Sequence, residues 1–255
     1  MKLKIMTFNL RTSNANDGIN NFENRKERIK EAIMYENPDI IGFQEINDSM
    51  TDHVKVAIRS KYTVIGCGRE ADRTGEGTRI AYKKKKFELL FLDNVWLSET
   101  PQVPGSRFSP DQSGCPRIFT VAEFMDRRTK KVFRIYNTHL DHGGELARIC
   151  GATQIIQHLS ERNRAFVCPN VLMGDLNARP DSQPIKIICA HLQELTEEVG
   201  QTFHGFGKRG NDPSIKIDYI FSDAKKCAPS YTVADESVAG VYISDHYPVC
   251  AFIEI

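Results

Sequence analysis

Carboxylate, amide and imidazole side chains follow short apolar runs at several places along this 255-residue chain. Asn9, Glu45 and Asp175 each stand at the end of such a run. A short apolar run is typical of a buried strand, and its end is a rigid place from which to present a polar group. One carboxylate there is more often a helix cap or a loop anchor. The complete set is Asn9, Glu45, His139, Asp175, Asn177, Asp218, Asp245 and His246.

These side chains are of the types that bind a hard divalent cation and a phosphate group. Glu, Asp and Asn oxygens suit Mg²⁺ or Mn²⁺, whereas His and Cys do not cluster at the spacing of a zinc site. His139 and His246 can transfer protons or contact a phosphoryl oxygen. Asn9 and Asn177 can orient a water or a phosphate without adding negative charge. The set indicates hydrolysis of a phosphate ester by metal-activated water.

In their order along the chain, these motifs resemble those of the endonuclease/exonuclease/phosphatase superfamily, over residues 3–255. The superfamily includes pancreatic deoxyribonuclease, exonuclease III-like repair enzymes, inositol polyphosphate 5-phosphatases, neutral sphingomyelinases and deadenylases. The resemblance implies one domain over residues 1–255, built as a four-layer α/β/β/α sandwich of two mostly antiparallel sheets flanked by helices. The motifs that carry the resemblance are Asn9, Gln44-Glu45, Gly174-Asp175-Leu176-Asn177, Asp218-Tyr219 and Ser244-Asp245-His246.

The resemblance also implies how the metal and the attacking water are held. Glu45 would be the main metal ligand, with Asn9 and Asp245 near the ion, directly or through water. Asn9 would also contact the substrate. Asp175 and Asn177 would position or deprotonate the attacking water.

The two histidines would act on the phosphate itself. His246 would contact the scissile phosphate, with Asp218 or Asp245 holding its ring. His139 matches a histidine on the opposite side of the phosphate, where a leaving oxygen could be protonated. Which group is the general base and which the general acid stays open.

Three further features are candidates for substrate contact. Arg117 stands at the start of a predicted strand. We give equal weight to two interpretations, a cation that faces the phosphate and a surface residue on an edge strand. His204 lies in a Gly-rich loop and could contact substrate, although a loop histidine is more often solvated. Residues 69–79 resemble a mobile loop of mixed charge, which would set substrate choice if it overhangs the site.

Hydrophobic periodicity predicts strands alternating with a few helices. The run Lys83–Lys86 is expected to be a solvated hairpin tip. The predicted helices are Phe22–Glu36, Ser49–Ser60, Glu145–Asn163 and Pro184–Ala190. The predicted strands are Lys4–Leu10, Asp39–Phe43, Tyr62–Cys67, Thr78–Tyr82, Phe87–Leu97, Ile118–Met125, Val132–Thr138, Val171–Gly174, Ile215–Phe221 and Tyr247–Ile255.

Net charge and cysteine content limit the substrate class and the cellular compartment that we expect. The formal net charge is +1, so a general attraction to long nucleic acid is not evident. A phosphomonoester or a short phosphodiester is therefore favoured over long DNA. Seven scattered cysteines with no Cys-x-x-Cys pair fit reduced thiols in a cytoplasmic protein. We expect no signal peptide and no membrane partner.

Two alternatives remain beside a small-substrate hydrolase. One is a nonspecific or structure-selective DNA or RNA nuclease, and the other is a non-catalytic binding module on the same fold. Arg11 stands where repair enzymes of the superfamily carry a second metal-associated group, which disfavours an apurinic-site activity. The loop around His204 and the strand that follows it most resemble the deadenylase-like bacterial members.

Overall fold

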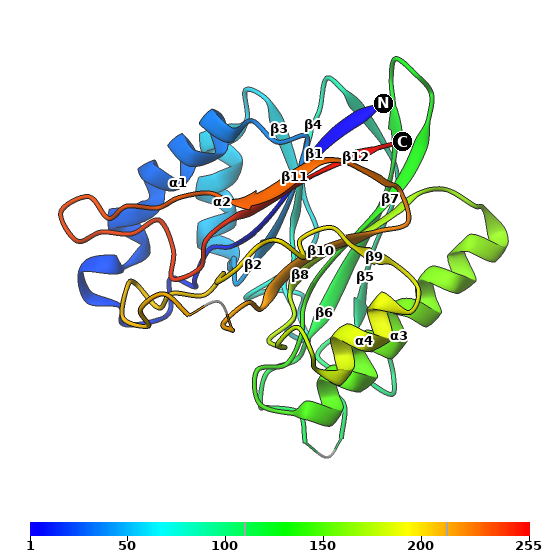
Figure 1. The fold of residues 1–255 in the computed structure, drawn as a ribbon. Coiled ribbons are helices and arrows are strands. Elements are labelled where there is room, and N and C mark those ends of the chain that lie inside the picture. Colours follow the sequence, from blue (N-terminus) through cyan, green and yellow to red (C-terminus); the bar gives the residue numbers. More distant parts are fainter. Residues whose placement is uncertain (110, 213) are drawn as a thin grey trace.

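Two six-stranded sheets pack face to face in the computed structural model, which describes residues 1–109, 111–212 and 214–255. The helices α1 (Phe22–Glu36) and α2 (Asp48–Ile58) cover the outer face of one sheet. The helices α3 (Glu145–Ala165) and α4 (Gln183–Cys189) cover the outer face of the other (Figure 1). The predicted four-layer α/β/β/α sandwich is confirmed.

Each sheet is mostly antiparallel and contains one parallel pair, β1–β2 in the first and β7–β8 in the second. The first sheet has the order β11 (Lys225–Thr232), β12 (Val249–Glu254), β1 (Lys2–Asn9), β2 (Ile40–Gln44), β4 (Ile80–Lys83) and β3 (Tyr62–Ile65). The second has the order β5 (Phe87–Trp96), β6 (Ile118–Asp126), β7 (Val132–His139), β8 (Asn170–Asp175), β10 (Asp218–Ser222) and β9 (Gln193–Glu194). A 3₁₀ turn, η1, spans Gly18–Asn20.

The hydrophobic core is divided into three layers, as expected for two sheets that each carry helices. One layer joins α1 and α2 to the first sheet, through residues such as Ile29 and Phe43. Another joins α3 and α4 to the second sheet, through residues such as Ile155 and Tyr136. The third fills the space between the sheets. Strands with both faces buried explain the unbroken apolar runs in the sequence.

The two parallel pairs determine where the site forms. The connection from β1 to β2 contains α1, and the connection from β7 to β8 contains α3, so both strands of each pair end on the same side. The register pairs Asn9 with Gln44 in the first sheet and His139 with Asp175 in the second. On the antiparallel neighbour β10, Asp218 stands opposite Asp175. The polar strand ends found in the sequence are therefore brought to one edge of the sandwich.

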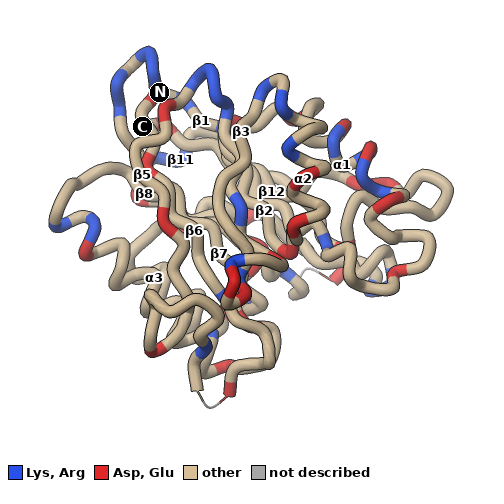
Figure 2. The backbone as a smooth tube through the Cα atoms, turned by 180° about the vertical axis from the view of Figure 1, so that it is seen from behind, with Lys and Arg blue, Asp and Glu red and all other residues tan. Residues whose placement is uncertain are grey.

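The predicted helices are all present, with small shifts at their ends. Asn21 caps α1 by accepting the Asn24 amide, and Asn47 caps α2 by accepting the Met50 amide. Residues 84–86 form the turn between β4 and β5, with Lys84 and Lys85 exposed, but these strands belong to different sheets, so the predicted hairpin is wrong. Because β4 runs antiparallel to β2, this turn lies at the end of the sandwich away from Glu45, near the two termini (Figure 2).

Two strands of the structure were not predicted, and one predicted strand starts before the observed one. The strand β11 lies at a sheet edge, contains Pro229 and is interrupted by register shifts, so its periodicity is weak. The strand β9 has only two residues. The predicted strand Ile215–Phe221 begins at Asp218, because the Thr202 hydroxyl accepts the backbone amides of Ile217 and Asp218. Within the described residues, no helix has the length and apolarity needed to cross a bilayer.

A buried asparagine joins the two sheets behind the site. Asn137 on β7 donates to the carbonyls of Phe43 (2.9 Å) and Arg79 (3.0 Å), and its Oδ1 accepts from Gln44 Nε2 (2.6 Å). Gly42 leaves the space for this side chain, because a Cβ there would lie 2.6 Å from Asn137 Oδ1. The sheets are therefore held in one relative position by hydrogen bonds as well as by apolar packing.

Replacing Asn137 by leucine should lower the free energy of unfolding by about 2–4 kcal/mol, because buried polar partners lose their hydrogen bonds. Urea-induced unfolding followed by circular dichroism measures the change. The exposed Asn16 provides the matched control, since Asn16→Leu should stay within about 0.5 kcal/mol of the wild type. An Asn137→Leu protein as stable as that control would contradict the role assigned to this hydrogen-bond network.

Candidate active site

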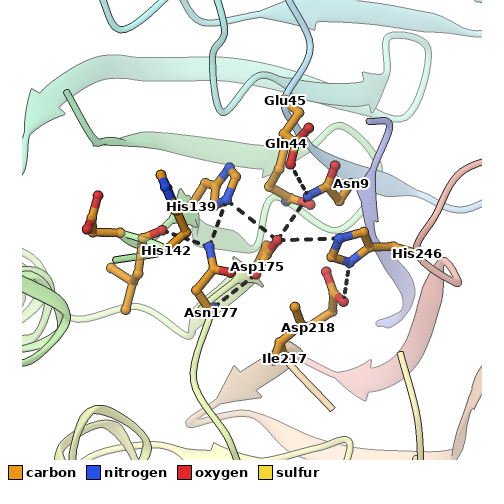
Figure 3. A network of polar contacts seen from close by, with 12 residues as sticks. Asn9, Gln44, Glu45, His139, His142, Asp175, Asn177, Ile217, Asp218 and His246 are labelled. Carbon is orange, nitrogen blue, oxygen red and sulfur yellow. Dashed lines mark hydrogen bonds and ion pairs between the residues drawn. The ribbon is translucent and has the colours of Figure 1, made fainter. Parts of the chain in front are cut away.

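The polar strand ends meet in one cluster between the two sheets (Figure 3). Asn9 is central to it: its Nδ2 donates to Glu45 Oε1 (3.1 Å) and to Asp175 Oδ2 (2.9 Å), and its Oδ1 accepts the Arg11 amide (2.9 Å). Glu45 Oε2 accepts the Thr12 amide at 3.0 Å. A carboxylate from each sheet is thus held by one asparagine side chain.

Residues at three of the strand ends adopt a backbone conformation that side chains other than glycine rarely use. The φ angles are 57° at Glu45, 46° at Asn177 and 53° at Arg11. Left-handed backbone at a non-glycine residue costs on the order of 1 kcal/mol and persists only where its surroundings hold it. At all three positions this conformation occurs just after a strand, where it redirects the chain around the cluster.

His246 is held in its charged form by carboxylates. Its Nδ1 lies 2.8 Å from Asp218 Oδ2, and its Nε2 lies 3.8 Å from Asp175 and 4.0 Å from Asp245. Burial alone would lower the pKa of His246, but the negative charges of Asp218, Asp245 and Asp175 outweigh it and raise the pKa to about 10. Of the two carboxylates expected to orient this ring, Asp218 makes the hydrogen bond.

His139 lies on the other side of Asp175 and is held in the opposite state. Burial lowers its pKa well below the usual value, and the positive charges of Arg117 and Arg69 lower it further. The Asn177 amide nitrogen donates to the Leu140 carbonyl (3.1 Å) and to His139 Nε2 (3.0 Å). That ring nitrogen therefore acts as an acceptor, and His139 is neutral while His246 is cationic.

Asp175 lies between the two histidines. Its Oδ1 accepts the backbone N–H of Asn177 at 2.9 Å, and its Oδ2 lies 3.5 Å from His139 Nε2. Burial, reinforced by the negative charge of Asp218, raises the pKa of Asp175 to about 7. A carboxylate with its pKa near neutrality is suited to take up a proton in turnover.

A cleft of about 370 Å³ opens over this cluster and contains most of the predicted residues. Arg117 lines this cleft and is 4% exposed. Of the two positions that the sequence left open for it, in the site or on the surface, the structure shows the first. Arg69 and Glu76 are among the lining residues that were not predicted as members of the site. They belong to the loop 66–79, which is built of paired backbone segments and overhangs the cleft. The cleft is lined by Arg11, Thr12, Glu45, Arg69, Glu76, Cys115, Arg117, His139, His142, Asp175, Asn177, Phe203, Ile217, Asp245 and His246.

His204 is not among the residues that line this cleft, so the expectation that it contacts the same substrate is not supported. Its ring stacks on Tyr247 at 4.2 Å and lines a separate hollow of about 580 Å³. The His204 amide donates to the Asp245 carbonyl at 2.9 Å, which connects the loop to the site through the backbone. Its sequence proximity to Phe203, which does line the cleft, explains the expectation.

The donor atoms of the cluster fit a divalent cation. One ligand atom each from Glu45, Asp175 and His246 lie within 4.8 Å of one another. Asp218 Oδ1 is buried without a hydrogen-bond partner among the described residues, so negative charge at this place is incompletely compensated. Because His246 is cationic and turned to Asp218, the carboxylates of Glu45 and Asp175 are the available oxygen ligands. Asp245, expected near the ion, lies 4.0 Å from His246 Nε2 and is outside this group of three.

The chain belongs to the Endonuclease/Exonuclease/phosphatase family, whose model matches residues 6–246. Members of this family are typically hydrolases that depend on a divalent cation. A family protein from Bacteroides vulgatus is 31% identical, with a TM-score of 0.91 over 100% of this chain and 99% of that one. The mannosyl-6-phosphatase of Bacteroides thetaiotaomicron is 28% identical, with a TM-score of 0.90 over 99% and 100%. Both structures support the family membership predicted from the sequence.

A deadenylase-like relative is also found, as the sequence suggested. The CCR4-Not complex 3′-5′-exoribonuclease subunit Ccr4 of Kluyveromyces lactis is 21% identical over 73% of this chain and 27% of its own length. The relatives thus include both a phosphatase and a nuclease, and they do not select a substrate.

Adding Mg²⁺ or Mn²⁺ should raise the midpoint of thermal unfolding, because the ion binds the folded carboxylate cluster. At ~100-fold excess over the dissociation constant, we expect a rise of about 5–10 °C, measured by differential scanning calorimetry. Glu45→Gln should lose most of this rise, whereas Glu31→Gln, on the exposed face of α1, should keep it. An equal rise in both variants would place the ion elsewhere.

Proposed function

We propose that this protein is a Mg²⁺- or Mn²⁺-dependent phosphohydrolase that uses an activated water to cleave a phosphate ester. The observation that supports it most is the position of Asp175, which lies between a cationic and a neutral histidine and shares Asn9 with Glu45. This arrangement combines a proton acceptor, a positive charge and a metal-binding carboxylate within one cleft. These are the groups that hydrolysis of a phosphate ester requires.

Asp175 and Asn177 are positioned to act on the attacking water. Both amide hydrogens of Asn177 are used by His139 and Leu140, so its Oδ1 is left to accept from a water. Asp175 takes the second proton as the water oxygen bonds to phosphorus. The ester P–O bond breaks, the leaving alkoxide takes a proton from solvent water, and Asp175 returns its proton to solvent, so that protons and charge balance.

His246 stabilises the negative charge that develops on the phosphate. The Nε2–H of His246 points away from Asp218 and is free to donate to a non-bridging oxygen. Asp218 is a positioning residue that keeps this ring charged and in place. Asn9 holds Glu45 and Asp175 at their separation. Because both of its Nδ2 hydrogens are donated to these carboxylates and it does not line the cleft, the expected contact of Asn9 with substrate is not supported.

A divalent cation held by Glu45, with Asp245 nearby, would supply Lewis acidity toward the phosphoryl oxygen, which leaves Asp175 free to act on the water. Glu45 is suited to this role, because the charge of His246 and the hydrogen bonds from Thr12 and Asn9 outweigh burial and lower its pKa. It therefore stays ionised and ready to bind a cation near neutral pH.

A small or short phosphoester is the substrate class that the cleft favours. The lysine-rich turn Lys83–Lys86 lies at the opposite end of the sandwich, so it cannot extend the cleft into a basic track (Figure 2). A protein that follows a long polyanion usually has such a track beside its site. The phosphatase among the relatives, at 28% identity over nearly the whole chain, agrees with this substrate class.

Replacing Asp175 by asparagine should lower kcat/KM by ~10²–10⁴-fold, because the water loses its proton acceptor. Release of p-nitrophenol from p-nitrophenyl phosphate with Mg²⁺ or Mn²⁺ measures it, beside single-stranded DNA, duplex DNA and short RNA as alternative substrates. Asp181→Asn, at an exposed position, is the control and should keep full activity. Full activity in a folded Asp175→Asn protein would rule out the proposed mechanism.

A further inference from the structure

The cleft contains two arginine side chains whose N–H groups are not all satisfied. Arg69 and Arg117 line it together with Glu45 and His139. The same four residues border a small cavity of about 10 Å³, close to the volume that one water molecule needs. Both arginines therefore belong to one wall of the cleft, beside the catalytic cluster.

Arg117 is buried with an unused donor. Its Nη2 donates to His142 Nδ1 at 2.8 Å, and its Nε lies 3.5 Å from Asp141 Oδ2. Its Nη1 has no hydrogen-bond partner among the described residues. An unsatisfied buried donor costs about 1–3 kcal/mol, and more when the group is charged, so a ligand that accepts this hydrogen bond recovers free energy on binding.

Arg69 brings a second positive charge to the same wall. Its Nη1 pairs with Glu76 at 2.9 Å, while its buried Nε lies 3.6 Å from Glu70 Oε1 and has no hydrogen-bond partner within the described part of the chain. The charge of Arg69 adds to burial in lowering the pKa of Arg117, which shows that the two cations repel each other. An anion placed between them relieves this repulsion.

The third arginine of the cleft differs in this respect. Arg11 makes two hydrogen bonds to Asp17, at 3.0 and 3.1 Å, and lies 3.7 Å from Asp245. Its charge is therefore already matched by carboxylates of the chain. Arg69 and Arg117 also lie beside carboxylates, but each keeps one buried N–H with no hydrogen-bond partner among the described residues.

The loop 66–79 holds Arg69 rigidly in this position. Trp96 Nε1 donates to the Arg69 carbonyl at 2.7 Å, and Gly77 pairs with both Gly68 and Ile46. A Cβ on Gly68 would collide with the Thr74 carbonyl, so the two sides of the loop approach more closely than other residues allow. With its backbone fixed in this way and its Nη1 paired with Glu76, the guanidinium of Arg69 loses little conformational entropy when it binds an anion.

We propose that Arg69 and Arg117 bind the non-bridging oxygens of a terminal phosphate, so that the protein selects a phosphomonoester over a phosphodiester. This inference rests on the proposed function and names its substrate class. A monoester dianion offers three non-bridging oxygens and two negative charges, whereas a diester offers two oxygens and one charge. His246 and the metal-binding carboxylates serve one side of the phosphate, and the two arginines serve the oxygen that a diester would have blocked by its second ester group.

The test compares two substrates with the same leaving group, p-nitrophenyl phosphate and methyl p-nitrophenyl phosphate. Arg69→Ala should lower kcat/KM for the monoester by about 10–100-fold, the loss of a charged hydrogen bond, and for the methyl diester by less than about threefold. Arg117→Lys, which keeps the charge and loses the planar fork, should change the ratio in the same direction. Arg73→Ala is the control, because Arg73 belongs to the same loop but stacks on Trp96 and does not line the cleft.

Equal losses on both substrates in Arg69→Ala, or a wild type that prefers the methyl diester, would overturn the inference while leaving the hydrolase proposal intact. Calorimetric titration with inorganic phosphate in the presence of Mg²⁺ gives a second measurement that needs no turnover. Arg69→Ala should weaken phosphate binding by at least about tenfold, and unchanged affinity would overturn the inference. Absence of turnover on every phosphoester tested would instead contradict the proposed function.

Discussion

The structure depends on the crowding of carboxylates where its two sheets meet. Glu45, Asp175, Asp218 and Asp245 come from different strands or strand ends and converge at the base of the cleft, where all but Glu45 are buried. Mutual repulsion and burial make such a cluster costly in free energy. Proteins accept that cost mainly where the site has a function, since a cluster of this kind is poised to bind a cation and move a proton.

Other groups of the chain offset the free-energy cost of the crowded carboxylates only in part. Each of these groups also has a role in the proposed chemistry. His246 contributes a positive charge beside Asp218, and Asn9 bridges Glu45 and Asp175 with a single amide group. Asn137 joins the sheets behind the site, so the carboxylates cannot separate by a shift of one sheet against the other. Asp218 Oδ1 has no hydrogen-bond partner among the described residues, which favours binding of a cation nearby. Arg117 Nη1 also has none, which favours binding of an anion.

Much of the site could be predicted because its residues stand at the ends of strands. Apolar runs that end in Asn9, Glu45 and Asp175 reveal both the strand and the functional group, and parallel pairing brings such ends together. Arg69 and Glu76 could not be found in this way, because their loop is placed by long-range contacts, such as the one between Trp96 and the Arg69 carbonyl, that no local pattern records. The same limit applies to β11, an edge strand containing Pro229, and to His204, whose ring turns away from the cleft that its neighbour Phe203 lines.

The most direct test of the central idea, that the crowded carboxylates exist to hold a catalytic cation, is a crystal structure with Mn²⁺ located by its anomalous scattering. The account predicts a dominant peak within bonding distance of Glu45 and beside Asp175, on the side of the cluster that faces the cleft. A saturated crystal with no peak at that place, or with its only peak at another group of acids, would contradict it.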